Sequence, residues 1–147
     1  LLTSKVLLMS TYQLVDSFGS IVEAYGRMRK VLAEELEFTE GISLSWFEVL
    51  LRISRSGGQM KMADISNQVV ITTGGITKLM DKMVEQGLIK RTPCNEDRRI
   101  VWACITEKGK NVFEKALASH NKSLKKHLGN LTDSEINTIT KIMNKLN

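Results

Sequence analysis

The amino-acid sequence predicts a mainly α-helical fold with a small β-hairpin, an α+β arrangement in a single domain of 147 residues. Three observations support it. Apolar residues recur at helical spacing along most of the chain, and a pair of strand-like segments, 88–91 and 100–105, flanks a turn-rich stretch. Two short helical segments joined by a tight turn come directly before that pair. We therefore expect a lobe at 43–105 between helices at 6–40 and 106–147.

The first helix carries an apolar stripe at heptad-like spacing. The stripe consists of Leu14, Phe18, Ile21, Tyr25, Met28 and Leu32. Val15 and Val22 widen it, so this helix can pack inside its own domain and also across the seam of a dimer. Packing within one chain alone is the alternative. An acidic run followed by Gly41 is expected to end the helix.

A second helix is expected from Leu44 to Ser54. Ser43 precedes it, and a serine hydroxyl can accept one of the backbone N–H groups that a helix start leaves unpaired. Its residues Phe47, Leu50 and Leu51 are expected to point inward. A glycine-rich loop then leads into the two short helices.

The two short helices have clear inner faces. In the first, Met62, Ile65 and Val69 share one face. Thr72 is placed to cap the second, and Gly87 to end it in the left-handed conformation that glycine favours. The inner face of the second helix consists of Ile76, Leu79, Met80 and Met83.

The outer face of the second short helix presents Thr73, Gly74, Thr77 and Lys78. Hydroxyl, bare-backbone and ammonium groups suit the major groove of DNA, which offers base acceptors and phosphates to one helix. A solvated helix surface is the alternative. Gly74 and Gly75 each cost about 1 kcal/mol relative to alanine inside a helix. We expect this bare backbone to approach a phosphate or a base edge, although helix starts also tolerate glycine.

The turn of the β-hairpin is basic, because it ends in Arg98 and Arg99. Asp97 lies two residues before Arg99 on the same side of the strand, where its carboxylate can hold the guanidinium group in one orientation. A pair that only stiffens the turn is the alternative. We call the hairpin from Leu88 to Ile105 the wing.

Five segments in register resemble the winged helix-turn-helix of MarR-type transcriptional regulators. They are Asp64-Ile65-Ser66, Thr77-Lys78-Leu79-Met80-Asp81-Lys82-Met83, Gly87-Leu88-Ile89-Lys90-Arg91, Asp97-Arg98-Arg99 and Ile105-Thr106-Glu107-Lys108-Gly109. The resemblance runs roughly from Ser43 to Lys115. It implies a homodimer that binds a palindromic operator in double-stranded DNA, as a repressor or an activator, and releases it when a small molecule binds or a cysteine is oxidised.

The resemblance also implies where the contacts lie. In such proteins the arginine of the wing Asp-x-Arg enters the minor groove, which here assigns that role to Arg99 beside Asp97. The expected DNA-binding residues are Thr73, Gly74, Thr77, Lys78, Asp97, Arg98 and Arg99. Effector sites in the family lie between the first helix, the second helix and the DNA-binding lobe. Tyr25, Met28, Trp46 and His120 are the expected lining, with ordinary core packing as the alternative.

The C-terminal part is expected to complete the dimer. A helix begins at Thr106, and His120 and His127 stand in its apolar stripe, where a hydrogen-bonded pair at the dimer seam is more common than a metal site. Thr132 and Glu135 have the spacing of a capping box and open a terminal helix. Its apolar face consists of Ile136, Ile139, Ile142, Met143 and Leu146.

Composition sets the remaining bounds. The formal charge of +5 favours a polyanionic partner. No apolar run reaches the roughly 20 residues of a membrane span, and residues 1–9 lack the basic region of a signal peptide, so they are expected to lead into a helix. Cys94 and Cys104 lie too far apart on the hairpin for a disulfide, which fits the reducing cytoplasm. Oxidant sensing by Cys94 stays open.

Catalysis is not expected, and no cofactor or metal site is indicated. The sequence has no phosphate-binding glycine loop, no nucleophile–histidine grouping and no paired metal-ligand motif. The competing interpretation is a winged helix that serves as a protein–protein or RNA adaptor, because a fold does not determine a function.

Overall fold

The computed structural model of the chain describes residues 11–68 and 73–146. The expected helical lead-in at residues 1–9, the inward position of Val69 and the cap at Thr72 lie outside these residues. Within them, helices and a small antiparallel sheet follow one another in the expected order. The elements are α2 (Thr11–Glu40), α3 (Leu44–Arg55), β1 (Gln59–Lys61), α4 (Met62–Gln68), α5 (Thr73–Glu85), β2 (Ile89–Pro93), β3 (Val101–Ile105), α6 (Glu107–Leu128) and α7 (Asp133–Asn144).

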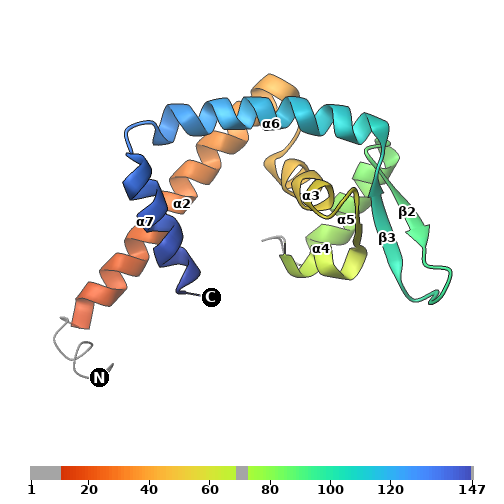
Figure 1. Ribbon diagram of the computed structural model, residues 1–147, viewed down its shortest axis with the longest axis horizontal. Coiled ribbons are helices and arrows are strands. Elements are labelled where there is room, and N and C mark those ends of the chain that lie inside the picture. Colours follow the sequence, from red (N-terminus) through yellow and green to blue (C-terminus); the bar gives the residue numbers. More distant parts are fainter. Residues whose placement is uncertain (1–10, 69–72, 147) are drawn as a thin grey trace.

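The long helix α6 joins two parts of the molecule (Figure 1). At one end lies the lobe with α3, α4, α5 and the sheet, and at the other end α6 turns into α7. The helix α2 packs along α6 and then extends away from the lobe. This arrangement leaves α7 and the first turns of α2 apart from the lobe.

The expected helix boundaries follow from their caps. The Ser43 hydroxyl accepts a hydrogen bond from the Trp46 N–H at 3.2 Å, and the Thr106 hydroxyl accepts one from the Gly109 N–H at 3.0 Å. Thr132 and Glu135 form the capping box that their spacing predicts. These local predictions are confirmed because the groups involved are neighbours in the sequence.

The sheet has three strands rather than the two that the sequence predicts. Its order is β1-β3-β2, and both pairings are antiparallel. The additional strand β1 pairs Met60 with Ala103. Gly57 and Gly58, with φ of 78° and 93°, turn the chain back toward β3 after α3. Three residues are too few to show a strand period, so only the distant partner reveals β1.

The lobe has one buried core, to which α3, α4, α5 and the sheet all contribute. Its fully or nearly buried members are Val49, Leu50, Ile53, Met60, Ile65, Ile76, Met80, Met83, Leu88, Ile89, Ala103 and Ile105. The expected inner face of α5 is confirmed at Ile76, Met80 and Met83, while Leu79 is half-buried. A second cluster joins α2, α3 and α6 through Leu36, Phe47 and neighbouring residues. The core of the lobe therefore fixes the position of α5 and leaves the opposite face of this helix exposed to solvent.

The first part of the apolar stripe of α2, up to Tyr25, and the apolar face of α7 are exposed. We call residues 12–25 of α2 together with α7 the arm. Its exposed large apolar side chains are Tyr12, Leu14, Val15, Phe18, Ile21, Val22, Tyr25, Ile136, Ile139, Ile142 and Met143. Helix α7 contributes no buried residue at all.

Candidate functional site

The outer face of α5 is polar and open to solvent. Thr73 and Gly74 form the start of the helix. One turn further along, Thr77 and Lys78 are exposed, as is Lys82. Because the buried Met80 and Met83 on the opposite face fix the rotation of the helix, the hydroxyl of Thr77 and the ammonium groups of Lys78 and Lys82 stay on the solvent side.

The tip of the wing holds an oriented guanidinium group. Arg99 donates from Nε and from Nη2 to the two carboxylate oxygens of Asp97, each at 3.1 Å, and its backbone N–H donates to Asp97 Oδ1 at 3.0 Å. These hydrogen bonds, the side-chain ones first, lower the pKa of Asp97. The Arg99 side chain is 90% exposed, and Arg98 beside it is also exposed. The pairing expected from the sequence is present.

A second ion pair ties α5 to the wing. Arg91 Nη2 on β2 lies 2.5 Å from Asp81 Oδ1 on α5. The contact pairs the carboxylate of Asp81, which lies between Lys78 and Lys82 on the outer face of α5, with a guanidinium group. It also couples the wing to the helix in front of it, which the sequence pattern did not reveal.

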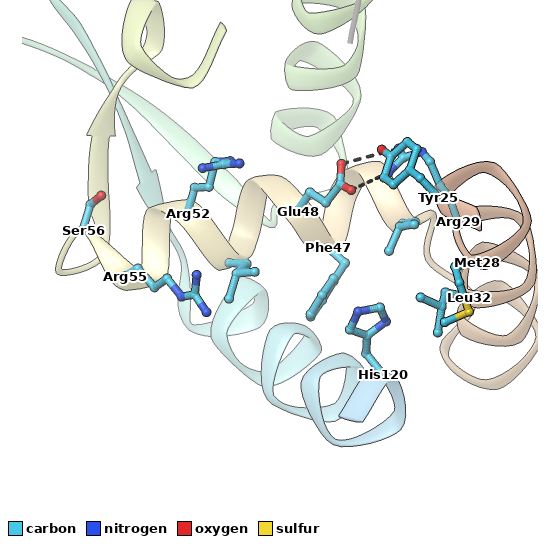
Figure 2. Close-up of a pocket in the computed structure, with 12 residues that line it drawn as sticks. Tyr25, Met28, Arg29, Leu32, Phe47, Glu48, Arg52, Arg55, Ser56 and His120 are labelled. Carbon is cyan, nitrogen blue, oxygen red and sulfur yellow. Dashed lines mark hydrogen bonds and ion pairs between the residues drawn. The ribbon is translucent and has the colours of Figure 1, made fainter. Parts of the chain in front are cut away.

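A cavity of about 430 Å³ lies between α2, α3 and α6 (Figure 2). Its apolar lining consists of Tyr25, Met28, Leu32, Leu44, Phe47 and Leu51, and its polar lining of Arg29, Glu48, Arg52, Arg55, Ser56 and His120. Such a mixture of an apolar wall with a few polar groups is typical of small-molecule sites.

His120 contributes a buried polar atom to this lining. Its ring centroid lies 4.7 Å from that of Phe47, and its Nδ1 is buried without a hydrogen-bond partner (Figure 2). Burial lowers the pKa of His120, because the charged imidazolium is disfavoured away from water, although the carboxylate of Glu48 opposes the shift. The ring is therefore a neutral polar group facing an apolar neighbour.

His127 has a partner of its own within the chain, and the expected hydrogen-bonded pair of histidines at a dimer seam stays a prediction. His127 Nε2 lies 3.0 Å from Glu35 Oε1, and Lys126 Nζ lies 2.7 Å from the same oxygen. The hydrogen bonds from Lys126, Ser123 and His127 lower the pKa of Glu35 to about 2. The seven-residue spacing places the two histidines on one face of α6, but their surroundings differ. His127 contacts a carboxylate, whereas the Nδ1 atom of His120 has no hydrogen-bond partner.

Arg29 and Glu48 form the ion pair at one wall of the cavity. Arg29 Nη1 lies 2.5 Å from Glu48 Oε1, and Nη2 lies 3.5 Å from Oε2. Both side chains are about one quarter exposed, at 28% and 27%. The hydrogen bond to Glu48 raises the pKa of Arg29.

Comparison with known proteins decides the family. A sequence model of the MarR family matches residues 42–101. The uncharacterized HTH-type transcriptional regulator YpoP of Bacillus subtilis (strain 168) is 30% identical over 136 residues, which cover 92% of this chain and 94% of YpoP. The HTH-type transcriptional repressor MdtR of the same organism is 26% identical over 139 residues, covering 95% of this chain and 85% of MdtR. The chain belongs to the MarR family.

Solved structures agree with this assignment at the level of the fold. Sco3205, a MarR family transcriptional regulator from Streptomyces coelicolor in complex with DNA, superposes with a TM-score of 0.81 at 20% identity, over 95% of this chain and 87% of Sco3205. The MarR family consists of DNA-binding transcriptional regulators rather than enzymes. The winged helix-turn-helix fold expected from the sequence is confirmed.

Three of the four residues expected to line an effector site line the cavity of this MarR-family chain. Tyr25, Met28 and His120 face it, whereas Trp46 packs against the two buried clusters instead. The charged lining was missed. Glu48, Arg52 and Arg55 recur at steps of four and three on α3, and that spacing could have revealed a charged face, although not the cavity that it lines.

Both cysteines are free thiols. Cys104 pairs with Lys90 across the wing, while the Cys94 N–H donates to Ile100 O near the turn. Backbone N–H groups of Asp97 and Glu96 lower the pKa of the Cys94 thiol, because they stabilise its thiolate. Over residues 11–68 and 73–146, no helix has the length and apolar character to cross a membrane, and no cluster of metal-ligating side chains occurs.

Proposed function

We propose that this chain is a homodimeric repressor that binds a palindromic operator in double-stranded DNA and releases it when a small molecule occupies the cavity between α2, α3 and α6. The observation that carries the proposal is the oriented, exposed guanidinium group of Arg99, coupled through the wing to the polar face of α5. A DNA partner also places the site of action in the cytoplasm.

The DNA contacts follow from the two exposed surfaces. Helix α5 enters the major groove, with Thr73, Thr77 and Lys78 at base edges or adjacent phosphates and Gly74 allowing close approach. Arg99 enters the minor groove, where Asp97 has already fixed its orientation, and Arg98 contacts the backbone. Preorganisation matters because an ordered guanidinium loses less conformational entropy on binding.

Dimerisation is supported by the exposed arm. The apolar side chains of the arm recur at helical spacing on α2 and α7 and are exposed to solvent. A continuous exposed apolar surface on a single chain is typical of a protein–protein interface. A twofold dimer uses the same surface on both copies, so one arm can cover the other. The two α5 helices would then reach half-sites about one helical turn, roughly 34–36 Å, apart.

Effector binding is supported by the cavity. Its volume of about 430 Å³ lies within the range of roughly 300–1,000 Å³ that holds small ligands. The unpartnered Nδ1 of His120 offers one polar anchor among apolar side chains. A ligand with an apolar body and one hydrogen-bonding group would contact the apolar walls and also pair with Nδ1 of His120.

The test begins by selecting bound duplexes from a random pool with the wild-type protein. Arg99→Ala should then weaken binding of the selected operator at least tenfold in a gel-shift titration while leaving the thermal midpoint almost unchanged, because Arg99 is exposed. Lys115→Ala, which removes an exposed cation from α6, is the matched control and should change neither. Equal affinity of Arg99→Ala and wild type would remove the wing from the mechanism.

Two further outcomes would contradict the proposal as a whole. The protein could remain monomeric at micromolar concentration, or it could ignore every duplex at low salt, where phosphate contacts are strongest. A screen of small molecules for release of the selected operator tests the effector step separately. Filling the cavity by Met28→Trp should then abolish release without abolishing DNA binding.

A further inference from the structure

The ion pair of Arg29 and Glu48 connects the two parts of the molecule that a dimeric regulator must hold in register. Arg29 belongs to α2, which carries the arm, and Glu48 belongs to α3, which is part of the lobe. Figure 2 shows the pair at one end of the cavity, beside Tyr25. A guanidinium group that reaches both oxygens of a carboxylate, at 2.5 and 3.5 Å here, fixes direction as well as distance.

Helix α3 moves with the DNA-binding helix. Leu50 and Ile53 of α3 are fully buried in the same cluster as Met80 and Met83 of α5. Close-packed cores transmit displacement rather than absorbing it. Any change in the angle of α3 therefore becomes a change in the position of α5.

The joint between α2 and α3 is less firmly packed than the lobe. The cavity of about 430 Å³ occupies space between these helices, so apolar contacts are missing on its walls. Further along α2, side-chain bonds join this helix to α6: Lys126 and His127 contact Glu35, and Ser119 donates to Glu40. The Arg29–Glu48 pair therefore lies where it can fix the angle between α2 and α3, which apolar packing around the cavity does not fix.

We propose that Arg29 and Glu48 are positioning residues that set the separation of the two α5 helices in the dimer, by holding the lobe at a fixed angle to α2. The inference rests on the proposed function, since it requires two copies on two half-sites. Without the pair, each lobe samples a range of angles, and binding one fixed operator costs more conformational entropy. An occupant of the cavity would touch both side chains and could act on the lobe through them.

The experiment compares the selected operator with versions whose half-sites are one base pair closer or farther apart. Glu48→Gln keeps the shape of the side chain and removes its charge. We expect it to bind the native spacing about tenfold more weakly than wild type and to discriminate less between spacings, since single residues of coupling networks contribute such factors. The charge-reversed double variant Arg29→Glu, Glu48→Arg should recover most of the affinity and the spacing preference.

The matched control is Glu107→Gln, which makes the same substitution in an exposed ion pair within α6. It should leave affinity and spacing preference as in wild type. Should the double variant fail to fold, Arg29→Gln replaces it and must reproduce the behaviour of Glu48→Gln. A different behaviour of the two single variants overturns the inference.

Three results would overturn the positioning role. Glu48→Gln could retain the affinity and spacing preference of wild type, it could lose affinity equally for all spacings and for non-specific duplex, or it could lose its fold. Sedimentation and thermal unfolding of each variant identify the last case. If the wild-type protein binds no operator, the proposed function fails; if it does and Glu48→Gln behaves identically, only this inference fails.

Discussion

Helix α5 in the lobe and helix α7 in the arm have the same kind of apolar pattern, yet only one of them is covered. Met80 and Met83 of α5 are completely buried, whereas Ile139 and Ile142 of α7 are 47% and 46% exposed. Both helices repeat apolar residues at steps of three and four. The pattern shows that a face needs a partner, but it does not say whether the partner lies in the same chain.

The comparison therefore assigns different roles to similar residues. Apolar residues of the lobe stabilise the folded chain, and those of the arm would contact a second copy in the proposed dimer. The free energy of unfolding that the lobe contributes should be independent of protein concentration, whereas the part that contacts of the arm contribute should depend on it.

Charges placed on α7 should abolish operator binding without unfolding the lobe. In the proposed dimer, the variant Ile139→Glu, Ile142→Glu would place two carboxylates of each copy in the apolar seam between the arms. We expect the operator affinity to fall by a factor of about 10²–10⁴, which is the gain that two linked binding sites give over one. Sedimentation should show a monomer, and circular dichroism an intact helical protein. A dimer of unchanged affinity would show that the arm is not the seam.

Truncation in the lobe should act on the protomer itself. Leu50→Ala leaves a hole at a fully buried position, and we expect the free energy of unfolding to fall by about 3 kcal/mol. Denaturant unfolding should give this loss at every protein concentration. Ile142→Ala is the matched control in the arm, and its effect should vanish upon dilution below the dimer dissociation constant. Concentration dependence of the Leu50→Ala loss would contradict the division between lobe and arm.

Two helical glycines differ in the space around them, and we expect a smaller difference in stability from substituting each. A Cβ at Gly109 would lie 2.0 Å from the carbonyl oxygen of Leu88, where α6 leaves the lobe, whereas a Cβ at Gly26 of α2 meets no atom within 4 Å. Gly109→Ala should therefore lower the free energy of unfolding by about 2 kcal/mol through overpacking. Gly26→Ala should be neutral or slightly stabilising, because alanine favours a helix. Thermal unfolding of both variants checks this, and equal effects would contradict the close contact.

Sequence reasoning predicted the local features because their determinants are neighbours in the chain. The caps at Ser43 and Thr132, and the Asp97–Arg99 pair, each join residues at most three positions apart. The inner face of α5 followed from its period. These features sufficed to predict the winged helix-turn-helix fold.

The features that were missed depend on contacts between distant segments. Strand β1 exists only because Met60 meets Ala103, and the Arg29–Glu48 pair joins two helices across a turn. Trp46 lies on α3, but its helix face points toward the buried clusters rather than the cavity, and only the packing of α2 and α6 against α3 decides that. His120 and His127 share a stripe but differ in their partners for the same reason.

The smallest expected effect concerns the attachment of α2 to α6 at low pH. The pKa of Glu35 is lowered from 4.5 to about 2 by hydrogen bonds from Lys126, Ser123 and His127. The unfolded chain therefore binds the proton more tightly, and the stabilisation that Glu35 gives is present above pH 4.5 and is lost as the pH falls toward 2. Glu35→Gln should be less stable than wild type at pH 6, and thermal unfolding should show the difference shrinking between pH 4.5 and pH 2. Glu107→Gln serves as the exposed control, and a difference that persists unchanged at the lowest pH would mean that the charge of Glu35 does not hold the two helices together.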